Sequence, residues 1–139
     1  MAYWLVKSEP STYSWDQLVK EGRTFWSGVR NYQASNNLKA MKNGDRAFFY
    51  HSGEDKAVVG IAEIVKEYYP DPTDESGKFG MVDVRALKPL KHPVTLEAIK
   101  AEPRLKDMVL VNNSRLSVQP VSEAEWTLIC KLGGLAERG

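Results

Sequence analysis

The feature of this sequence that most limits its fold is a series of strand-like runs, most of them short, separated by tight turns. Aromatic and β-branched residues gather in these runs, as is typical of β-strands. The six predicted strands cover residues 3–7, 47–51, 57–68, 81–87, 108–111 and 116–119. A doubly wound parallel sheet needs strands that alternate strictly with long helices, and that alternation is absent. The pattern therefore predicts an α+β fold, a mixed β-barrel of about six strands with three to four short helices.

Capping residues place the predicted helices between these strands. Residues 14–17 and 122–125 each form a capping box, in which a serine side chain and a residue three positions later satisfy the first free backbone groups. The predicted helices cover residues 15–21, 32–42, 95–101 and 122–132. Gly60, inside a predicted strand, indicates a bulge or a close approach by another backbone. Residues 70–77 are predicted to form a flexible polar loop.

The size and charge of the chain narrow the classes of function. A length of 139 residues and a hydrophobic content of 42% predict a single domain, residues 1–139, with its own core. A net charge of +1 argues against a protein that grips long duplexes through many phosphates, but allows a site for one nucleotide. Short apolar runs and a strand that begins at Tyr3 leave no membrane span and no signal peptide, so we expect a cytoplasmic protein.

Metal and thiol chemistry are not expected. One cysteine and two histidines are too few for a zinc site built from this chain alone, so we predict no metal and no cofactor. Cys130 lies among apolar residues on a predicted helix, which favours a buried, small hydrophobic side chain over a nucleophile.

A polar and aromatic segment at residues 26–33 predicts a binding site for a flat ring with polar edges. A tryptophan packed in a core does not need such polar neighbours. A nucleobase pocket does, because it combines a stacking ring with groups that hydrogen-bond the edge of the base. The candidate residues of this segment are Trp26, Ser27, Val29, Arg30, Asn31, Tyr32 and Gln33.

A second polar cluster, Lys7, Ser8 and Glu9, follows the first predicted strand. The chain leaves the barrel wall there and can present backbone and hydroxyl groups to a ligand. Glu9 can accept a hydrogen bond from an exocyclic amine, as carboxylates do from cytosine. We therefore expect the two segments to form one nucleobase site, with Trp26 as the stacking platform.

Structural explanations compete with these roles. Trp26 can be a core residue, and Ser8 with Glu9 can simply close a turn. Asn31 can cap the second predicted helix, whether or not it also lines the pocket. Arg30 can pair with a carboxylate instead of a phosphate.

Four motifs resemble the EVE domain in sequence and order. They stand at residues 3–10, 26–34, 48–52 and 115–121, and the resemblance runs from residue 3 to about residue 132. The EVE domain has a PUA-like barrel fold and is similar to the YTH domain, which holds a methylated base in an aromatic cage. The resemblance therefore implies recognition of a modified nucleobase in RNA or DNA, flipped out of its stack.

The resemblance also adds candidate residues and shows two departures. It places His51 and Ser52 near the mouth of the pocket, although a lone histidine is more often a structural residue. Tyr32 and Phe79 are candidate second walls of the cage. Phe79 stands where the family tends to have tryptophan, and Ser35 stands where it usually has arginine.

The preferred interpretation is a non-enzymatic reader of a modified base. The alternative is a small amide hydrolase, similar to members of the related ASCH group, in which Lys7 acts with Glu9 or Glu63 on a modified nucleoside. The chain has no set of nucleophile, base and orienting group at a recognisable spacing. A third possibility, a protein-interaction module, would need an exposed apolar patch and no base-sized pocket.

Overall fold

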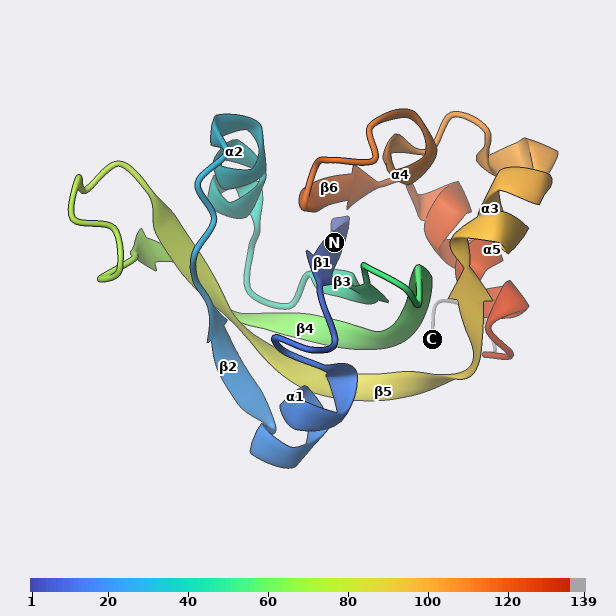
Figure 1. Cartoon of the computed structure of the whole chain (residues 1–139), viewed down its shortest axis with the longest axis horizontal. Coiled ribbons are helices and arrows are strands. Elements are labelled where there is room, and N and C mark those ends of the chain that lie inside the picture. The colour runs from blue at the N-terminus through green and yellow to red at the C-terminus, as the bar shows by residue number, and fades with distance from the viewer. Residues whose placement is uncertain (136–139) are drawn as a thin grey trace.

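A six-stranded mixed sheet forms the centre of the computed structural model, which describes residues 1–135 (Figure 1). The strands are β1 (Tyr3–Ser8), β2 (Arg23–Trp26), β3 (Arg46–His51), β4 (Ala57–Pro70), β5 (Gly80–Thr95) and β6 (Val118–Val121). The helices are α1 (Trp15–Glu21), α2 (Tyr32–Ala40), α3 (Leu96–Ala101), α4 (Val109–Asn112) and α5 (Glu123–Leu132), with a 3-10 turn at Pro103–Leu105. The predicted α+β class is confirmed.

The strand order is β2-β5-β4-β3-β1-β6, so β2 and β6 are the edge strands. β1 runs parallel to β3, and the other neighbours are antiparallel. α2 packs against the neighbouring strands β4 and β5 and also against β6, the edge strand at the other end of this order. The helix therefore bridges the sheet across its curved inner side, as Figure 1 shows.

Both faces of the sheet are buried, which explains the nearly continuous apolar sequence of β1. Tyr3 and Leu5 belong to one cluster of buried residues, and Trp4 and Val6 belong to the other. The first cluster lies under α3, α4 and α5, where Trp126 stacks on Tyr3 with a centroid distance of 4.5 Å. The second cluster faces α1 and α2.

The strand predicted at residues 108–111 is wrong, because most of that segment forms α4. The Asn112 and Asn113 amides donate to the carbonyls four residues earlier, at 3.2 and 2.7 Å. A short apolar run does not distinguish a buried strand from a buried helical turn. The sixth strand is instead β2, which we did not predict.

The end of the strand predicted at residues 81–87 is also wrong, since β5 continues through Lys88 and Pro89 to Thr95. Pro89 faces Gly60 at a place where the β4–β5 register shifts. A bulged ladder tolerates a residue without an N–H, so proline does not end the strand there. The bulge expected at Gly60 is confirmed, and the group that approaches this glycine closely is the Trp15 ring.

None of the helices formed by residues 1–135 is long and apolar enough to cross a membrane. The cytoplasmic location stays a prediction.

Candidate nucleic-acid interface

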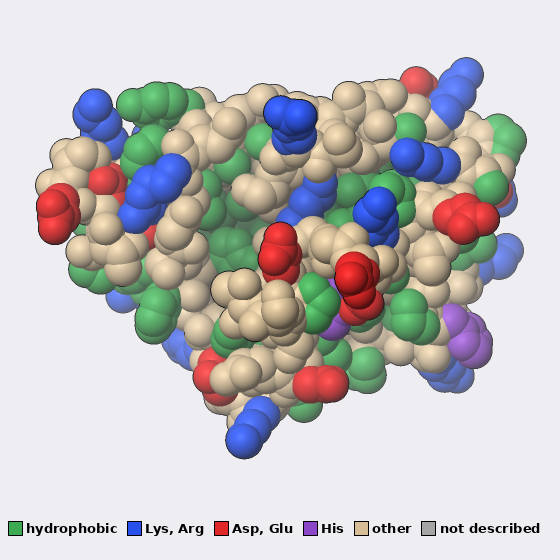
Figure 2. Space-filling model, viewed as in Figure 1, with side chains coloured by type: hydrophobic (Ala, Val, Ile, Leu, Met, Phe, Trp, Pro, Cys, Tyr) green, Lys and Arg blue, Asp and Glu red, His purple; other side chains and the backbone are tan. Residues whose placement is uncertain are grey.

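A cavity of about 640 Å³ opens between the end of β1 and the end of β2. One wall comes from Lys7, Ser8 and the loop residues Thr12 and Tyr13, and the opposite wall from residues 24–30. Glu21 and Ser117 complete the lining. Figure 2 shows a hollow near the middle of this face, with hydrophobic side chains on its floor. The two segments singled out in the sequence therefore meet at one site.

Trp26 ends β2 and is half-buried on the cavity wall. Phe49 and Tyr13 contact the indole at centroid distances of 5.6 and 6.5 Å, with ring planes at 86° and 88°. Neither ring is stacked on the indole. Trp26 thus packs against the inner core while it borders an open cavity, which is the arrangement a stacking platform requires.

The first strand brings three polar groups to the cavity. The Lys7 amide donates to the Ser117 carbonyl at 3.0 Å, and the Lys7 ammonium donates to the Ser114 carbonyl. Burial lowers the pKa of Lys7. The Ser8 hydroxyl donates to the Tyr13 carbonyl at 2.6 Å, so its oxygen is available to a ligand only as an acceptor.

A phenol and a carboxylate share one side of the cavity. The Tyr13 hydroxyl donates to a Glu21 carboxylate oxygen at 2.7 Å. Burial and the hydrogen bond to Glu21 raise the pKa of Tyr13 to about 12. The same hydrogen bond lowers the pKa of Glu21. At neutral pH this side of the cavity therefore presents a neutral phenol and an ionised carboxylate.

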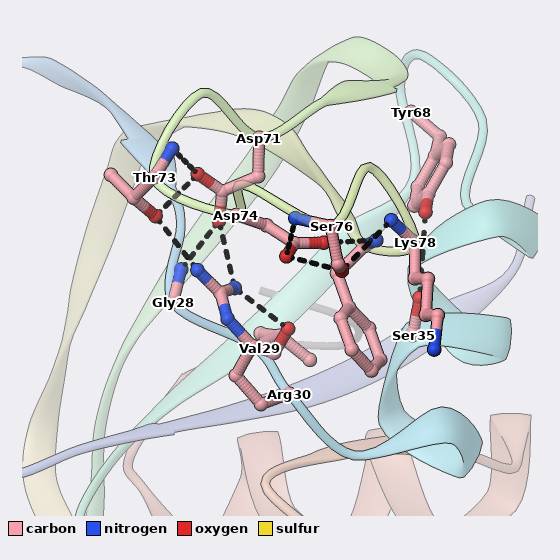
Figure 3. Close-up of polar contacts among 11 residues, drawn as sticks. Gly28, Val29, Arg30, Ser35, Tyr68, Asp71, Thr73, Asp74, Ser76 and Lys78 are labelled. Carbon is pink, nitrogen blue, oxygen red and sulfur yellow. Dashed lines mark hydrogen bonds and ion pairs between the residues drawn. The ribbon is translucent and has the colours of Figure 1, made fainter.

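A buried carboxylate fixes the opposite wall (Figure 3). Asp71 accepts hydrogen bonds from the Gly28 amide at 2.9 Å and from the Arg30 guanidinium at 3.1 Å. Its other oxygen accepts from the Thr73 amide and hydroxyl at 2.8 and 2.6 Å. Burial alone would raise the pKa of Asp71, but the bonds from Thr73, Gly28 and Arg30 outweigh it and lower the pKa to about 2. The carboxylate ties the loop that follows β4 to the cavity wall.

Three candidates at the start of α2 lie outside the cavity lining. The Asn31 side chain accepts from the Ala34 amide at 2.9 Å and caps the helix, which is the structural alternative considered for it. Tyr32 and Gln33 follow it and are exposed. Phe79 is also outside the lining, with its ring 5.0 Å from the Tyr32 ring. The expected aromatic cage of Trp26, Tyr32 and Phe79 is therefore not assembled around this cavity.

Glu9, His51 and Ser52 support the β1 wall without lining it. The Glu9 carbonyl accepts from two amides, at 2.8 and 2.9 Å, so this residue closes a turn. His51 accepts from the Trp15 amide at 3.0 Å through Nε2, and Nδ1 pairs with Asp55. The Ser52 amide donates to the Ser8 carbonyl at 2.9 Å.

Several lining residues were not among the predicted site residues. The set is Thr12, Tyr13, Glu21, Thr24, Phe25, Gly28 and Ser117. The β-branched and aromatic run Thr24-Phe25-Trp26 could have predicted β2, and with it this wall. Asp71 lies in a polar loop, where sequence alone does not separate a buried carboxylate from a solvated one. Across residues 1–135, no group of histidine, cysteine or carboxylate side chains could hold a metal ion.

The fold and the motifs agree with known proteins. The EVE domain family matches residues 2–132. The chain belongs to the EVE domain family. A protein of Rhodopseudomonas palustris, solved by NMR, is 64% identical with a TM-score of 0.92, over 96% of this chain and 94% of that chain.

Human THYN1, solved in complex with DNA containing 5-methylcytosine, is 35% identical with a TM-score of 0.91. The match covers 96% of this chain and 98% of the THYN1 chain in that structure. A YTH domain of Zygosaccharomyces rouxii is 21% identical with a TM-score of 0.62, over 98% of this chain and 88% of that domain, and shows a shared fold. The PUA-like fold implied by the EVE resemblance is confirmed.

Proposed function

We propose that this EVE domain binds nucleic acid without catalysis and takes one modified base into the cavity between β1 and β2. The observation that carries the proposal is the half-buried indole of Trp26 on the wall of that cavity, opposite the hydrogen-bonding groups of Lys7 and Ser8. Stacking on Trp26 holds the base, and polar groups of both walls read its edge.

The size of the cavity supports this proposal, because about 640 Å³ lies within the range of small-molecule sites. The partly apolar floor supports a preference for a modified base. A methyl group buried against a dry apolar wall contributes only about 0.8 kcal/mol to the binding free energy. Unpaired polar groups on the wrong base therefore contribute most of the selectivity.

The likeness to THYN1 supports a base in a polynucleotide. THYN1 binds DNA that contains 5-methylcytosine, and the match with it covers nearly all of both chains. We therefore propose that the present protein binds a modified base in DNA or RNA.

The hydrolase alternative gains less support from the geometry. Glu9 is exposed outside the cavity lining, and Glu63 is paired with Arg85 at 2.6 Å. Lys7 lies in the cavity with a lowered pKa, as a catalytic base would. The carboxylate on the cavity wall is Glu21, which is hydrogen-bonded to Tyr13. Lys7 thus lacks the carboxylate partners expected for hydrolysis.

The test is the Trp26→Ala variant. We expect binding of an oligonucleotide with one 5-methylcytosine to weaken by roughly 5- to 150-fold, the loss of one stacked base. Trp26→Phe, which keeps an aromatic ring, should retain most of the affinity. Fluorescence anisotropy with matched methylated and unmethylated DNA and RNA measures both effects and identifies the preferred polymer.

Two results would contradict the proposal. One is unchanged binding by a folded Trp26→Ala protein. The other is turnover of acylated nucleosides by the wild type that Lys7→Ala abolishes, which would favour the hydrolase.

A further inference from the structure

A group with two aromatic rings lies beside the cavity, and the proposed function uses neither ring. It consists of Tyr32, Phe79 and the guanidinium of Arg30, called here the aromatic ledge. The rings of Tyr32 and Phe79 are 5.0 Å apart with planes at 37°, and the Arg30 guanidinium lies 5.8 Å from the Phe79 ring centre. Tyr32 is 62% exposed, among the most exposed large hydrophobic side chains of residues 1–135.

The ledge is held rigidly from the loop between β4 and β5. The Phe79 amide donates to Asp74 at 2.7 Å, and the Phe79 carbonyl accepts from the Asp71 amide at 3.2 Å. Asp74 also accepts from the Ser76 amide and hydroxyl, at 3.0 and 2.6 Å (Figure 3). Because these hydrogen bonds constrain the loop that was predicted to be flexible, binding of a ligand to the ledge costs little conformational entropy of the protein.

Arg30 joins the ledge to the cavity. It is part of the cavity lining, and its guanidinium lies over the Phe79 ring. Asp71 and Thr73 hold the guanidinium at 3.1 and 2.9 Å, yet 40% of the side chain is exposed. A strand whose base occupies the cavity therefore passes a fixed cation and then an exposed aromatic surface.

We propose that the aromatic ledge stacks the base of a nucleotide next to the one in the cavity. This inference rests on the proposed function, and it assigns Tyr32 and Phe79 to a second subsite outside the cavity. Stacking on an aromatic ring tolerates any base, so the ledge adds affinity for a strand without adding sequence preference. Arg30 contributes a cation near the backbone between the two bases.

The test compares two ligands: the free nucleoside 5-methyldeoxycytidine and a single-stranded DNA pentamer with 5-methylcytosine at its centre. Tyr32→Ala should weaken pentamer binding by roughly 5- to 150-fold and leave nucleoside binding within about twofold. Tyr32→Phe, which keeps the ring, should bind both like the wild type. Two further pentamers carry an abasic site on the 5′ or on the 3′ side of the 5-methylcytosine. One of the two should show the same loss with the wild type, and no further loss with Tyr32→Ala.

The outcomes separate this inference from the proposed function. Equal weakening of the nucleoside and the pentamer by Tyr32→Ala would overturn the ledge, as would unchanged pentamer binding. Pentamer binding that depends on Tyr32 but not on Trp26 would support the ledge and contradict the cavity. Failure of the wild type to bind either ligand would overturn both. Thermal unfolding of each variant shows that it is folded.

Discussion

At the scale of the residue, Asp71 organises more of the candidate site than any side chain predicted from the sequence. Its buried carboxylate joins Gly28, Arg30 and Thr73 across two segments. Trp26 was found because its neighbours are unusually polar for a core tryptophan. Asp71 was not, since its partners lie more than forty positions away in the chain, apart from Thr73.

Replacement of Asp71 by asparagine should destabilise the protein by roughly 2 kcal/mol, because a neutral amide accepts the hydrogen bonds from Thr73, Gly28 and Arg30 more weakly than the carboxylate does. The ionised Asp71 stabilises the fold above the pKa of a free carboxyl, and this contribution is lost as the pH falls toward about 2. The stability difference between wild type and Asp71→Asn should therefore shrink between about pH 5 and pH 2. Urea unfolding at several pH values measures it, and a constant difference would contradict the role of the carboxylate.

At the scale of the element, the absence of a side chain at Gly60 allows α1 to pack against the sheet. A Cβ atom at this position would lie 2.6 Å from ring carbons of Trp15, the first residue of α1. The sequence predicted α1 and its caps from local signals. It did not predict the packing against β4, because the contact joins residues far apart in the chain.

Gly60→Ala should therefore destabilise the protein by about 1–3 kcal/mol through overpacking. In a Trp15→Leu background the same substitution should cost much less, since the ring that causes the clash is gone. Urea unfolding of the four proteins gives the coupling energy. Equal costs in both backgrounds would show that the clash with Trp15 is not the cause.

At the scale of the whole molecule, one sheet has a hydrophobic core on each face. The stability of the fold therefore depends on the sheet and on the helices that cover both faces. Cys130 lies on the buried side of α5, within the first core cluster, and is fully buried, as the sequence predicted. Burial raises the pKa of its thiol to about 11. Native protein at pH 8 therefore has almost no reactive thiolate, and a reagent reaches it only through opening of this core.

We expect the Cys130 thiol to resist Ellman's reagent in the native protein and to react fully in urea. The rate of labelling should rise steeply with urea concentration, because it follows the opening of the core. Rapid labelling without denaturant would show that α5 opens locally and is not part of the cooperative core.

The sequence by itself determined the caps of α1, α3 and α5, most strands, and the two segments that border the cavity. Hydrogen bonds between near neighbours and side-chain periodicity act over only a few residues, so a short stretch of sequence contains them. Tertiary structure decided that residues 109–111 form part of α4, that Tyr32 and Phe79 lie outside the cavity lining, and that Asp71 is buried against the cavity wall. Those outcomes depend on contacts between distant segments, whose free energies no short stretch of sequence contains.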